Sequence, residues 1–418
     1  MKAGLEARKV AVYAMNAVTS EGRLLSEALP RMTEGMTPAE RARVGRLATG
    51  ALRWAGRSDR LLGPHLRMKP EDAVLNAMRL AIYEIYVDGA PDHAAVDAAV
   101  SMSERSKAGL VNGVLRSLRR REPVWDDTPL PGLPKWLRKR LVSAWGKENV
   151  AAMEVVFAAD PPLDISLKPA EDVAKWAETL NADIRPDGGL RLKSMGQVSA
   201  LPGFDDGIWW VQDAGASVGA RLLEVKAGES VLDLCAAPGG KTMQLAATGA
   251  KVTALDVSKD RMVRVTENLK RTGLSAEHVI ADALKWQPDQ TFDAILLDAP
   301  CSASGTLRRH PDLAHARDGD GIEKLMALQE QLIGRAVSWL KPGGRIVYCT
   351  CSLFPEEGEA QIEAALIRHK GMSVVPVKGD WIDPKWQTEA RTLRIRPDHW
   401  AENGGIDGFF VALLEKRQ

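Results

Sequence analysis

Apolar residues recur every three or four positions through the first third of the chain, which is typical of amphipathic helices. One helix is predicted over residues 72–87, and the same spacing continues toward residue 118. The apolar positions are Leu75, Met78, Ile82, Ile85, Val96, Val100, Val111, Val114, Leu115 and Leu118. Thr37 followed by Pro38 has the pattern of a helix N-cap with proline at the first helical position. No alternating strand pattern is present here, so we predict an all-helical domain over residues 1–121.

The next segment breaks this pattern. Residues 122–134 contain four prolines and one glycine, a composition typical of a linker. A small α/β module is predicted over residues 135–205. Its expected elements are a basic amphipathic helix at 135–141, a strand at 163–168, a helix at 169–180 and a strand near 190–192.

From about residue 206 to residue 418, short apolar runs alternate with helical stretches. The predicted strands are Ser230–Leu234, Lys251–Leu255, His278–Ile280, Phe292–Leu297 and Arg345–Tyr348, and a helix is predicted over 322–340. Such alternation predicts a mainly parallel sheet covered by helices on both faces, a Rossmann-like domain. Residues 392–396 and 409–414 are expected to form an antiparallel pair at one edge. The predicted fold class is therefore α + α/β.

Composition and charge narrow the functional classes. The 418 residues are 45% hydrophobic and 27% charged, as in soluble globular proteins. No apolar run is long enough for a membrane helix, the first residues lack an apolar signal core, and four cysteines exclude a disulfide scaffold. We therefore expect a cytoplasmic protein without a membrane partner, and a monomer. Residues 1–121 hold 20 Lys and Arg against 13 Asp and Glu, which favours a polyanionic partner such as nucleic acid.

Acidic residues follow the first four strands of the predicted sheet. The segment DLCAAPGGKT runs from Asp233 to Thr242, and its Gly-Gly turn lets backbone N–H groups approach a ligand. It is neither G-x-G-x-x-G nor a phosphate-binding P-loop. Asp256, Asp282 and Asp298 follow later strands. A Gly-Gly pair alone is commonly a tight turn and a lone acid commonly a helix cap, but together they indicate a cofactor that contains a nucleoside.

Two cysteines are also expected at strand ends, in Pro-Cys301-Ser and Thr-Cys351-Ser. A thiolate is a strong nucleophile once its environment lowers its pKa. The alternatives are buried small side chains, or a zinc site formed with Cys235 and Cys349. Zinc ligands usually come in two close pairs, and two of these four cysteines stand alone, so no metal is expected. Cys349 is expected to be dispensable for chemistry.

Four segments of the sheet domain resemble, in order, the RNA cytosine-C5 methyltransferases of the NOL1/NOP2/Sun type. They are VQDAGAS (211–217), DLCAAPGGKT (233–242), LLDAPCSASGTLRRHPD (296–312) and YCTCSLFPEEGE (348–359). Gly358 stands where that family usually has asparagine. The helical third is similar to the antitermination factor NusB, through segments such as GLVNGVLR (109–116).

This resemblance implies S-adenosylmethionine as cofactor and RNA as substrate, with 16S ribosomal RNA the expected target. Asp256 would contact the ribose and Asp282 would lie near the adenine. Asp298 is also expected to be one of the residues that bind the cofactor. The cofactor turn would consist of Cys235, Ala236, Ala237, Pro238, Gly239, Gly240 and Lys241.

The resemblance also implies how the reaction proceeds. Cys351 would attack C6 of a cytosine that is out of its stack, and Asp298 would hydrogen-bond the edge of the base. Cys301 would then help to remove the proton from C5. Lys241 would either place positive charge near the reacting base or form a salt bridge.

Three other classes of protein remain alternatives on the residues alone. A DNA cytosine methyltransferase would use the cysteine after the fourth strand, usually in a Pro-Cys-Gln context. A nicotinamide oxidoreductase would need G-x-G-x-x-G, which is absent from the sequence. A non-catalytic RNA-binding factor would account for residues 1–121 but not for two strand-end cysteines.

Overall fold

The structure is a computed structural model that describes residues 4–120, 125–193 and 197–417. The chain forms two compact units. We call them the helical unit (Met1–Asp160 and Leu307–Gly319) and the sheet unit (Pro161–Thr306 and Asp320–Gln418). Residue 121 of the expected helical domain and residues 122–124 of the expected linker lie outside the described residues. No helix in the described ranges is both long and apolar enough to cross a membrane.

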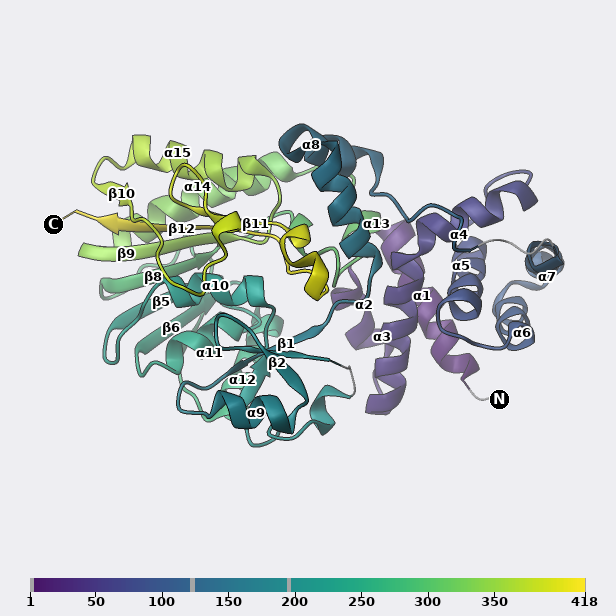
Figure 1. The fold of residues 1–418 in the computed structure, drawn as a ribbon, viewed down its shortest axis with the longest axis horizontal. Coiled ribbons are helices and arrows are strands. Elements are labelled where there is room, and N and C mark those ends of the chain that lie inside the picture. Colours follow the sequence, from purple (N-terminus) through teal and green to yellow (C-terminus); the bar gives the residue numbers. More distant parts are fainter. Residues whose placement is uncertain (1–3, 121–124, 194–196, 418) are drawn as a thin grey trace. The chain divides into compact units, whose positions relative to one another are not determined.

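The helical unit contains helices and no strands in its described part, as the apolar spacing predicts (Figure 1). Its elements are α1 (Leu5–Glu21), α2 (Leu25–Met32), α3 (Pro38–Arg53), α4 (Ala55–Leu62), η1 (Gly63–His65), α5 (Asp72–Tyr86), α6 (Asp92–Met102), α7 (Arg105–Arg120), α8 (Lys135–Ala158) and α13 (Leu313–Ala316). The predicted N-cap is confirmed, because Thr37 Oγ1 accepts a hydrogen bond from the N–H of Glu40.

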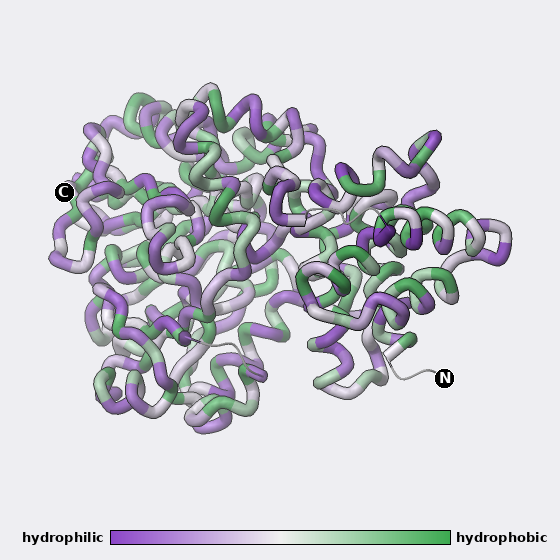
Figure 2. Tube along the Cα trace, turned by 45° about the vertical axis from the view of Figure 1, so that its right-hand side comes forward, coloured by the Kyte–Doolittle hydropathy of each residue, from purple (hydrophilic) through white to green (hydrophobic). Residues whose placement is uncertain are grey.

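Two apolar clusters form the core of this unit. One lies among α1, α3 and α5, and the other among α5, α6 and α7. Met78 and Ile82 of α5 are fully buried in the second cluster, which also takes up Val111 and Leu115 of α7. Helix α7 buries one apolar stripe and exposes Arg116 and Arg120, as its spacing predicts. Helix α5 differs, because every residue from Val74 to Glu84 is buried. Hydrophobic and hydrophilic residues alternate along the chain of this unit (Figure 2).

Two segments of the helical unit were expected, from the sequence pattern, to belong to other parts of the chain. Helix α8 belongs to it, although residues 135–205 were expected to form one α/β module. Leu307–Gly319 also belongs to it, although residues 307–312 are part of the signature segment 296–312. The buried guanidinium of Arg53 donates to the backbone carbonyls of Phe157 and Arg308, at 3.0 and 2.6 Å. These long-range hydrogen bonds leave no trace in local periodicity.

The sheet unit begins with a small antiparallel sheet of order β2-β3-β1-β4. Its elements are β1 (Leu163–Leu167), α9 (Val173–Thr179), β2 (Ala182–Ile184), β3 (Leu190–Leu192), η2 (Val198–Ala200) and β4 (Trp209–Val211). Strands at 163–167 and 190–192 agree with the prediction. Because β4 pairs with β1, this sheet extends beyond the expected boundary at residue 205.

The large sheet has the order β10-β12-β9-β8-β5-β6-β7, with β11 also paired to β12. Its strands are β5 (Ser230–Leu234), β6 (Lys251–Asp256), β7 (Glu277–Ile280), β8 (Phe292–Asp298), β9 (Leu340–Thr350), β10 (Met372–Val374), β11 (Leu393–Ile395) and β12 (Phe409–Lys416). The five strands from β9 to β7 are parallel, as predicted. The predicted antiparallel pair of β11 and β12 forms, but β12 lies between β9 and β10 rather than at an edge.

Helices cover both faces of the large sheet (Figure 1). On one face lie α10 (Ala214–Leu222), α11 (Gly240–Ala246) and α12 (Lys259–Thr272), and on the other α14 (Ile322–Trp339) and α15 (Glu359–Arg368). Successive residues of a strand point to opposite faces. Val231 of β5 accordingly packs with the first group and Leu232 with the second. Short 3-10 turns complete the unit at Ser304–Thr306, Pro355–Glu357, Pro384–Trp386 and Pro397–Asn403.

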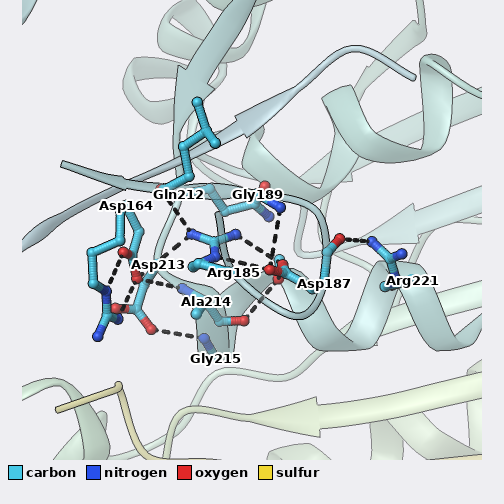
Figure 3. Close-up of polar contacts among 12 residues, drawn as sticks. Asp164, Arg185, Asp187, Gly189, Gln212, Asp213, Ala214, Gly215 and Arg221 are labelled. Atoms are coloured by element: carbon cyan, nitrogen blue, oxygen red, sulfur yellow. Dashed lines mark hydrogen bonds and ion pairs between the residues drawn. The ribbon is translucent and has the colours of Figure 1, made fainter. Parts of the chain in front are cut away.

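A network of buried charges joins the small sheet to the large one (Figure 3). Asp164 of β1 accepts hydrogen bonds from Arg191 of β3 at 2.7 and 2.8 Å, and from the N–H of Ala214 at 3.1 Å. Arg185 lies 3.6 Å from Asp164 and pairs with Asp187 at 2.8 Å. Charges with so little exposure remain stable only when each has a partner.

The same network reaches the loop before β12. Asp213 caps α10 by accepting from the N–H of Gly215 at 2.8 Å, and the same oxygen accepts from the N–H of Asp407 at 3.1 Å. Asp213 and Asp407 are both buried. The side chain of Asp213 therefore fixes the start of α10 against a loop nearly 200 residues away in sequence.

We expect Asp164→Ala to lower the free energy of unfolding by about 3–5 kcal/mol, because it leaves the buried guanidinium of Arg191 without its carboxylate partner. Urea denaturation of the purified variant measures this. Asp183→Ala is the matched control: it breaks an exposed pair with Lys193 in the same sheet and should change stability by about 0–1 kcal/mol. Equal losses in both variants would show that the buried network does not hold the small sheet.

Candidate active site

The expected cofactor turn lies at the carboxyl ends of the parallel strands. β5 ends at Leu234, and the N–H groups of Cys235 and Ala236 then both donate to the carbonyl of Leu255 in β6, at 2.9 and 3.0 Å. Gly239 has φ +101°, a backbone conformation that favours glycine. The Cys235 thiol is mostly enclosed, and burial raises its pKa. Cys235 therefore shapes the turn rather than acting as a nucleophile.

Asp256, expected to contact a ribose, holds this turn in place. Only 2% of its surface is exposed. One carboxylate oxygen accepts from the N–H of Ala237 at 3.1 Å and the other from the N–H of Ser258 at 2.9 Å, and Arg261 lies 3.6 Å away. A carboxylate offers about four lone-pair sites, so these bonds leave acceptor capacity for a hydroxyl.

Asp282 lies just after β7, and 42% of its side chain is exposed. It accepts from the N–H of Leu284 at 2.9 Å. Two apolar side chains beside these acids were not anticipated: Val257 is 70% exposed directly after Asp256, and Ile280 is 51% exposed at the end of β7. Val257 could have been found from the sequence, because an apolar residue directly after a strand-end acid is a candidate for contact with the cofactor.

Lys241 and Asp298 form a largely buried ion pair with Nζ and Oδ2 2.7 Å apart. Lys241 Nζ also lies 5.2 Å from the centre of the Phe409 ring. Burial opposes the charge on Lys241, but the interaction with Asp298 outweighs it and raises the lysine pKa. Lys241 was expected either to place positive charge near the reacting base or to form a salt bridge, and in the structure it forms the salt bridge.

The two strand-end cysteines lie together. Cys301 follows β8, Cys351 follows the neighbouring strand β9, and their Sγ atoms are 3.5 Å apart. The hydrogen bond to Cys351, followed by burial, raises the pKa of the Cys301 thiol well above its usual value. The protonated Cys301 thiol is therefore placed to donate a hydrogen bond to Sγ of Cys351.

Cys349 lies within β9 and is fully buried. Its thiol donates to Asp298 Oδ1 at 3.5 Å, and burial raises its pKa. That Cys349 is dispensable for the chemistry stays a prediction, and the structure places its thiol against the acid of the site. In the described ranges, no group of three or more His, Cys, Asp or Glu side chains is arranged to hold a metal ion.

The presence of glycine at residue 358 has a steric explanation. A Cβ atom built on it would lie 2.5 Å from Arg394 Nη2 and 2.6 Å from Cγ of Phe410, closer than side chains normally approach. Arg394 is held there because it donates to the carbonyl of Ser352 and pairs with Glu359. In this chain, the space of an asparagine side chain at residue 358 is therefore already occupied.

Asp233 differs from the other strand acids because it has no exposed surface. Its Oδ2 accepts from Thr242 Oγ1 at 2.6 Å, while Oδ1 has no hydrogen-bond partner among the described residues. Burial raises its pKa from 3.8 to about 7. Asp233 therefore lies under the turn and does not present a carboxylate to a ligand.

A mainly parallel sheet with one antiparallel strand inserted near its end, an acid-lined turn after β5 and paired cysteines after β8 and β9 define a methyltransferase of the Rossmann-like class. Comparison with known proteins agrees. Residues 220–415 match the family described as 16S rRNA methyltransferase RsmB/F, and residues 5–120 match the NusB family. The chain belongs to the RsmB/F family of rRNA methyltransferases and carries an N-terminal NusB domain.

Similar proteins cover the whole chain. The "Ribosomal RNA small subunit methyltransferase B" of Erwinia tasmaniensis is 35% identical over 100% of both chains. Among solved structures, PH0851 is 25% identical with a TM-score of 0.75 and full coverage of both chains. A methyltransferase homologue from Pyrococcus horikoshii is 29% identical with a TM-score of 0.57, covering 66% of this chain and 93% of its own.

The raised pKa of Asp233 predicts a pH-dependent stability. The folded protein holds this proton more tightly than the unfolded chain, so the stabilisation is complete below pH 3.8 and is lost as the pH rises to about 7. Asp233→Asn keeps the shape without ionising. It should gain stability relative to the wild type between about pH 5 and pH 7, as measured by urea unfolding at a series of pH values. A constant difference between the two proteins would contradict the raised pKa.

Proposed function

We propose that this protein transfers a methyl group from S-adenosylmethionine to C5 of a cytidine in RNA, with 16S ribosomal RNA as the target, through a covalent cysteine–cytosine intermediate. The observation that carries the proposal is the pair of thiols, Cys301 and Cys351, which lie 3.5 Å apart after two neighbouring strands. The full-length similarity to ribosomal RNA small subunit methyltransferase B supports the choice of substrate.

The residues at the strand ends fit the proposed cofactor. The exposed apolar side chains of Val257 and Ile280 offer surface for an adenine, with Asp282 beside them for its polar edge. Asp256 would bind the ribose through its remaining acceptor sites. The turn Cys235–Lys241 would enclose the rest of the molecule. When bound, S-adenosylmethionine supplies an electrophilic methyl group on a sulfonium.

Cytosine C5 is too weak a nucleophile to accept a methyl group directly, so the base must first be activated. The Cys351 thiolate adds to C6, and the electron pair of the C5–C6 double bond becomes available at C5. Asp298 accepts a hydrogen bond from the protonated edge of the base, which favours this addition. Lys241 forms an ion pair with Asp298 at 2.7 Å, which holds that carboxylate in place for the contact.

Release of the product requires the proton on C5 to leave. Cys301 first gives up its own thiol proton to solvent. As the Cys351–C6 bond breaks, the C5 proton passes to the resulting Cys301 thiolate and the C5–C6 double bond reforms. The raised pKa of Cys301 suits this step, because it makes the thiolate a stronger base. Since C6 must be reached from one face of the ring, the target is a cytidine that is single-stranded or flipped out of its stack.

The helical unit would supply affinity for RNA. Helix α7 exposes Arg105, Arg116 and Arg120, and its remaining exposed face contains Gly109 and Gly113. Cations on a face with small neighbours can approach phosphate groups closely. Contacts of this kind give affinity that weakens as salt increases.

Single substitutions separate the roles of the two cysteines. Cys351→Ala removes the attacking thiolate, so neither a covalent adduct nor methylated RNA should form. Cys301→Ala should still attack and methylate but release slowly, so a methylated adduct should accumulate and survive denaturing electrophoresis. The measurement is a denaturing gel with labelled RNA and S-adenosylmethionine, and both variants should melt like the wild type.

Two outcomes of that gel would contradict the assignment. An adduct that persists in Cys351→Ala and vanishes in Cys301→Ala would exchange the two roles and indicate the mechanism of DNA cytosine methyltransferases. Wild-type turnover in both variants would exclude a covalent mechanism. Offering RNA and DNA with tritiated S-adenosylmethionine decides the polymer, and bisulfite sequencing of the product locates the methylated cytidine.

Charge reversal tests the RNA surface. Arg116→Glu with Arg120→Glu should weaken RNA binding and lower the slope of log affinity against log salt by about 1 per residue. The matched control is Lys226→Glu with Lys251→Glu, which changes exposed cations at the amino ends of β5 and β6, opposite the strand ends that carry the site. Filter binding across a salt series measures both pairs. Equal slopes in the two double variants would remove α7 from the RNA interface.

A further inference from the structure

Glu357 is a fully buried carboxylate that the reaction scheme does not use. It lies in the 3-10 turn Pro355–Glu357, shortly after Cys351. The neighbouring Glu356 has the same side chain but is exposed. A carboxylate loses much hydration free energy on burial, so its position depends on the donors that surround it.

One set of donors comes from the segment that carries Cys301. The N–H of Ser302 donates to both carboxylate oxygens of Glu357, at 2.9 and 3.2 Å. Gln329 of α14 donates to Oε1 at 3.0 Å and also to the carbonyl of Pro300 at 2.9 Å. The residues on both sides of Cys301 are therefore tied to Glu357, one directly and one through Gln329.

A second set comes from the segment that carries Cys351. Ser352 Oγ donates to Oε2 of Glu357 at 2.6 Å. The backbone carbonyl of Glu357 accepts from Thr350 Oγ1 at 3.2 Å and from the hydroxyl of Tyr348 at 2.8 Å. The residues on both sides of Cys351 are therefore bound to the same glutamate.

We propose that Glu357 is the positioning residue that holds Sγ of Cys301 against Sγ of Cys351. Its carboxylate is shared by loops that follow two different strands, so the separation of the thiols depends on it. The distinct roles of the two thiols rest on the proposed function, but their proximity does not.

Electrostatics act in the same direction. The negative charge of Glu357 contributes to the raised pKa of Cys301, after the hydrogen bond to Cys351 and burial. Glu357 thereby favours the state in which Cys301 keeps its proton and donates a hydrogen bond to Cys351. A neutral side chain of the same shape would retain some of the geometry and lose this bias.

Cross-linking of the two thiols tests the geometry without RNA or cofactor. Diamide accepts the two electrons and two protons that a pair of thiols gives up as the S–S bond forms. In the wild type, Cys301 and Cys351 should form a disulfide readily, detected by mass spectrometry after alkylation. Glu357→Gln should slow this reaction on the order of tenfold, since small displacements of reacting groups have large effects on rate. The control Glu356→Gln should match the wild type.

Turnover provides a second measurement. Glu357→Gln should lower kcat while KM for RNA stays near the wild-type value, because the base still binds but meets misplaced thiols. If Glu357→Gln does not fold, Ser352→Ala removes one bond to the same carboxylate and should slow cross-linking in the same direction.

Several results would overturn the proposal. One is an equal cross-linking rate in all folded variants. Another is a wild-type protein whose thiols do not cross-link. The third is a lower melting temperature of Glu357→Gln without any change in its cross-linking rate. Because cross-linking needs neither RNA nor S-adenosylmethionine, failure of the methylation experiments would leave this result intact, and the reverse also holds.

Discussion

The ion pair between Lys241 and Asp298 joins two parts of the sheet unit that the proposed reaction requires together. Lys241 is the second residue of α11, after the cofactor turn, and Asp298 ends β8, just before Cys301. Removing both charges from water is costly, and a pair with good geometry offsets much of that cost. A change at Asp298 would leave the ammonium of Lys241, whose side chain is 10% exposed, without its partner. This ion pair therefore links the cofactor turn to the segment that carries Cys301.

Backbone contacts bring the surrounding loops close together. The N–H of Gly305 donates to the carbonyl of Cys351 at 2.9 Å, and the N–H of Gly408 donates to the carbonyl of Gly305 at 2.8 Å. A Cβ on Gly305 would lie 2.1 Å from the oxygen of Gly408, so only glycine fits there. Since Asp407 is bound to the N-cap Asp213, the buried network of the small sheet continues into the loops of the site.

Much of the fold could be predicted because its signals are local. The strand Ser230–Leu234 has apolar residues at Val231, Leu232 and Leu234, as in buried parallel strands, and its predicted bounds are those of β5. The helix after Thr37 begins where its cap predicts. The antiparallel strand β12 was recognised as a strand, but its place between β9 and β10 was not, because neighbours in a sheet are chosen by packing across the whole unit.

By itself, the sequence determined most helices, the parallel strands, the sheet class and the residue types at the strand ends, since periodicity and short motifs act over a few residues. It missed the short strands β2, β4 and β10, which form only because partner strands pair with them. Tertiary structure alone decided which of these residues touch. It paired Lys241 with Asp298 and brought Cys349 against the same acid. It also buried Asp233, and it placed Glu357 between the two cysteine loops. Each of these outcomes depends on segments far apart in the chain meeting in a space with little water, where one neighbouring charge or donor decides the state of a side chain.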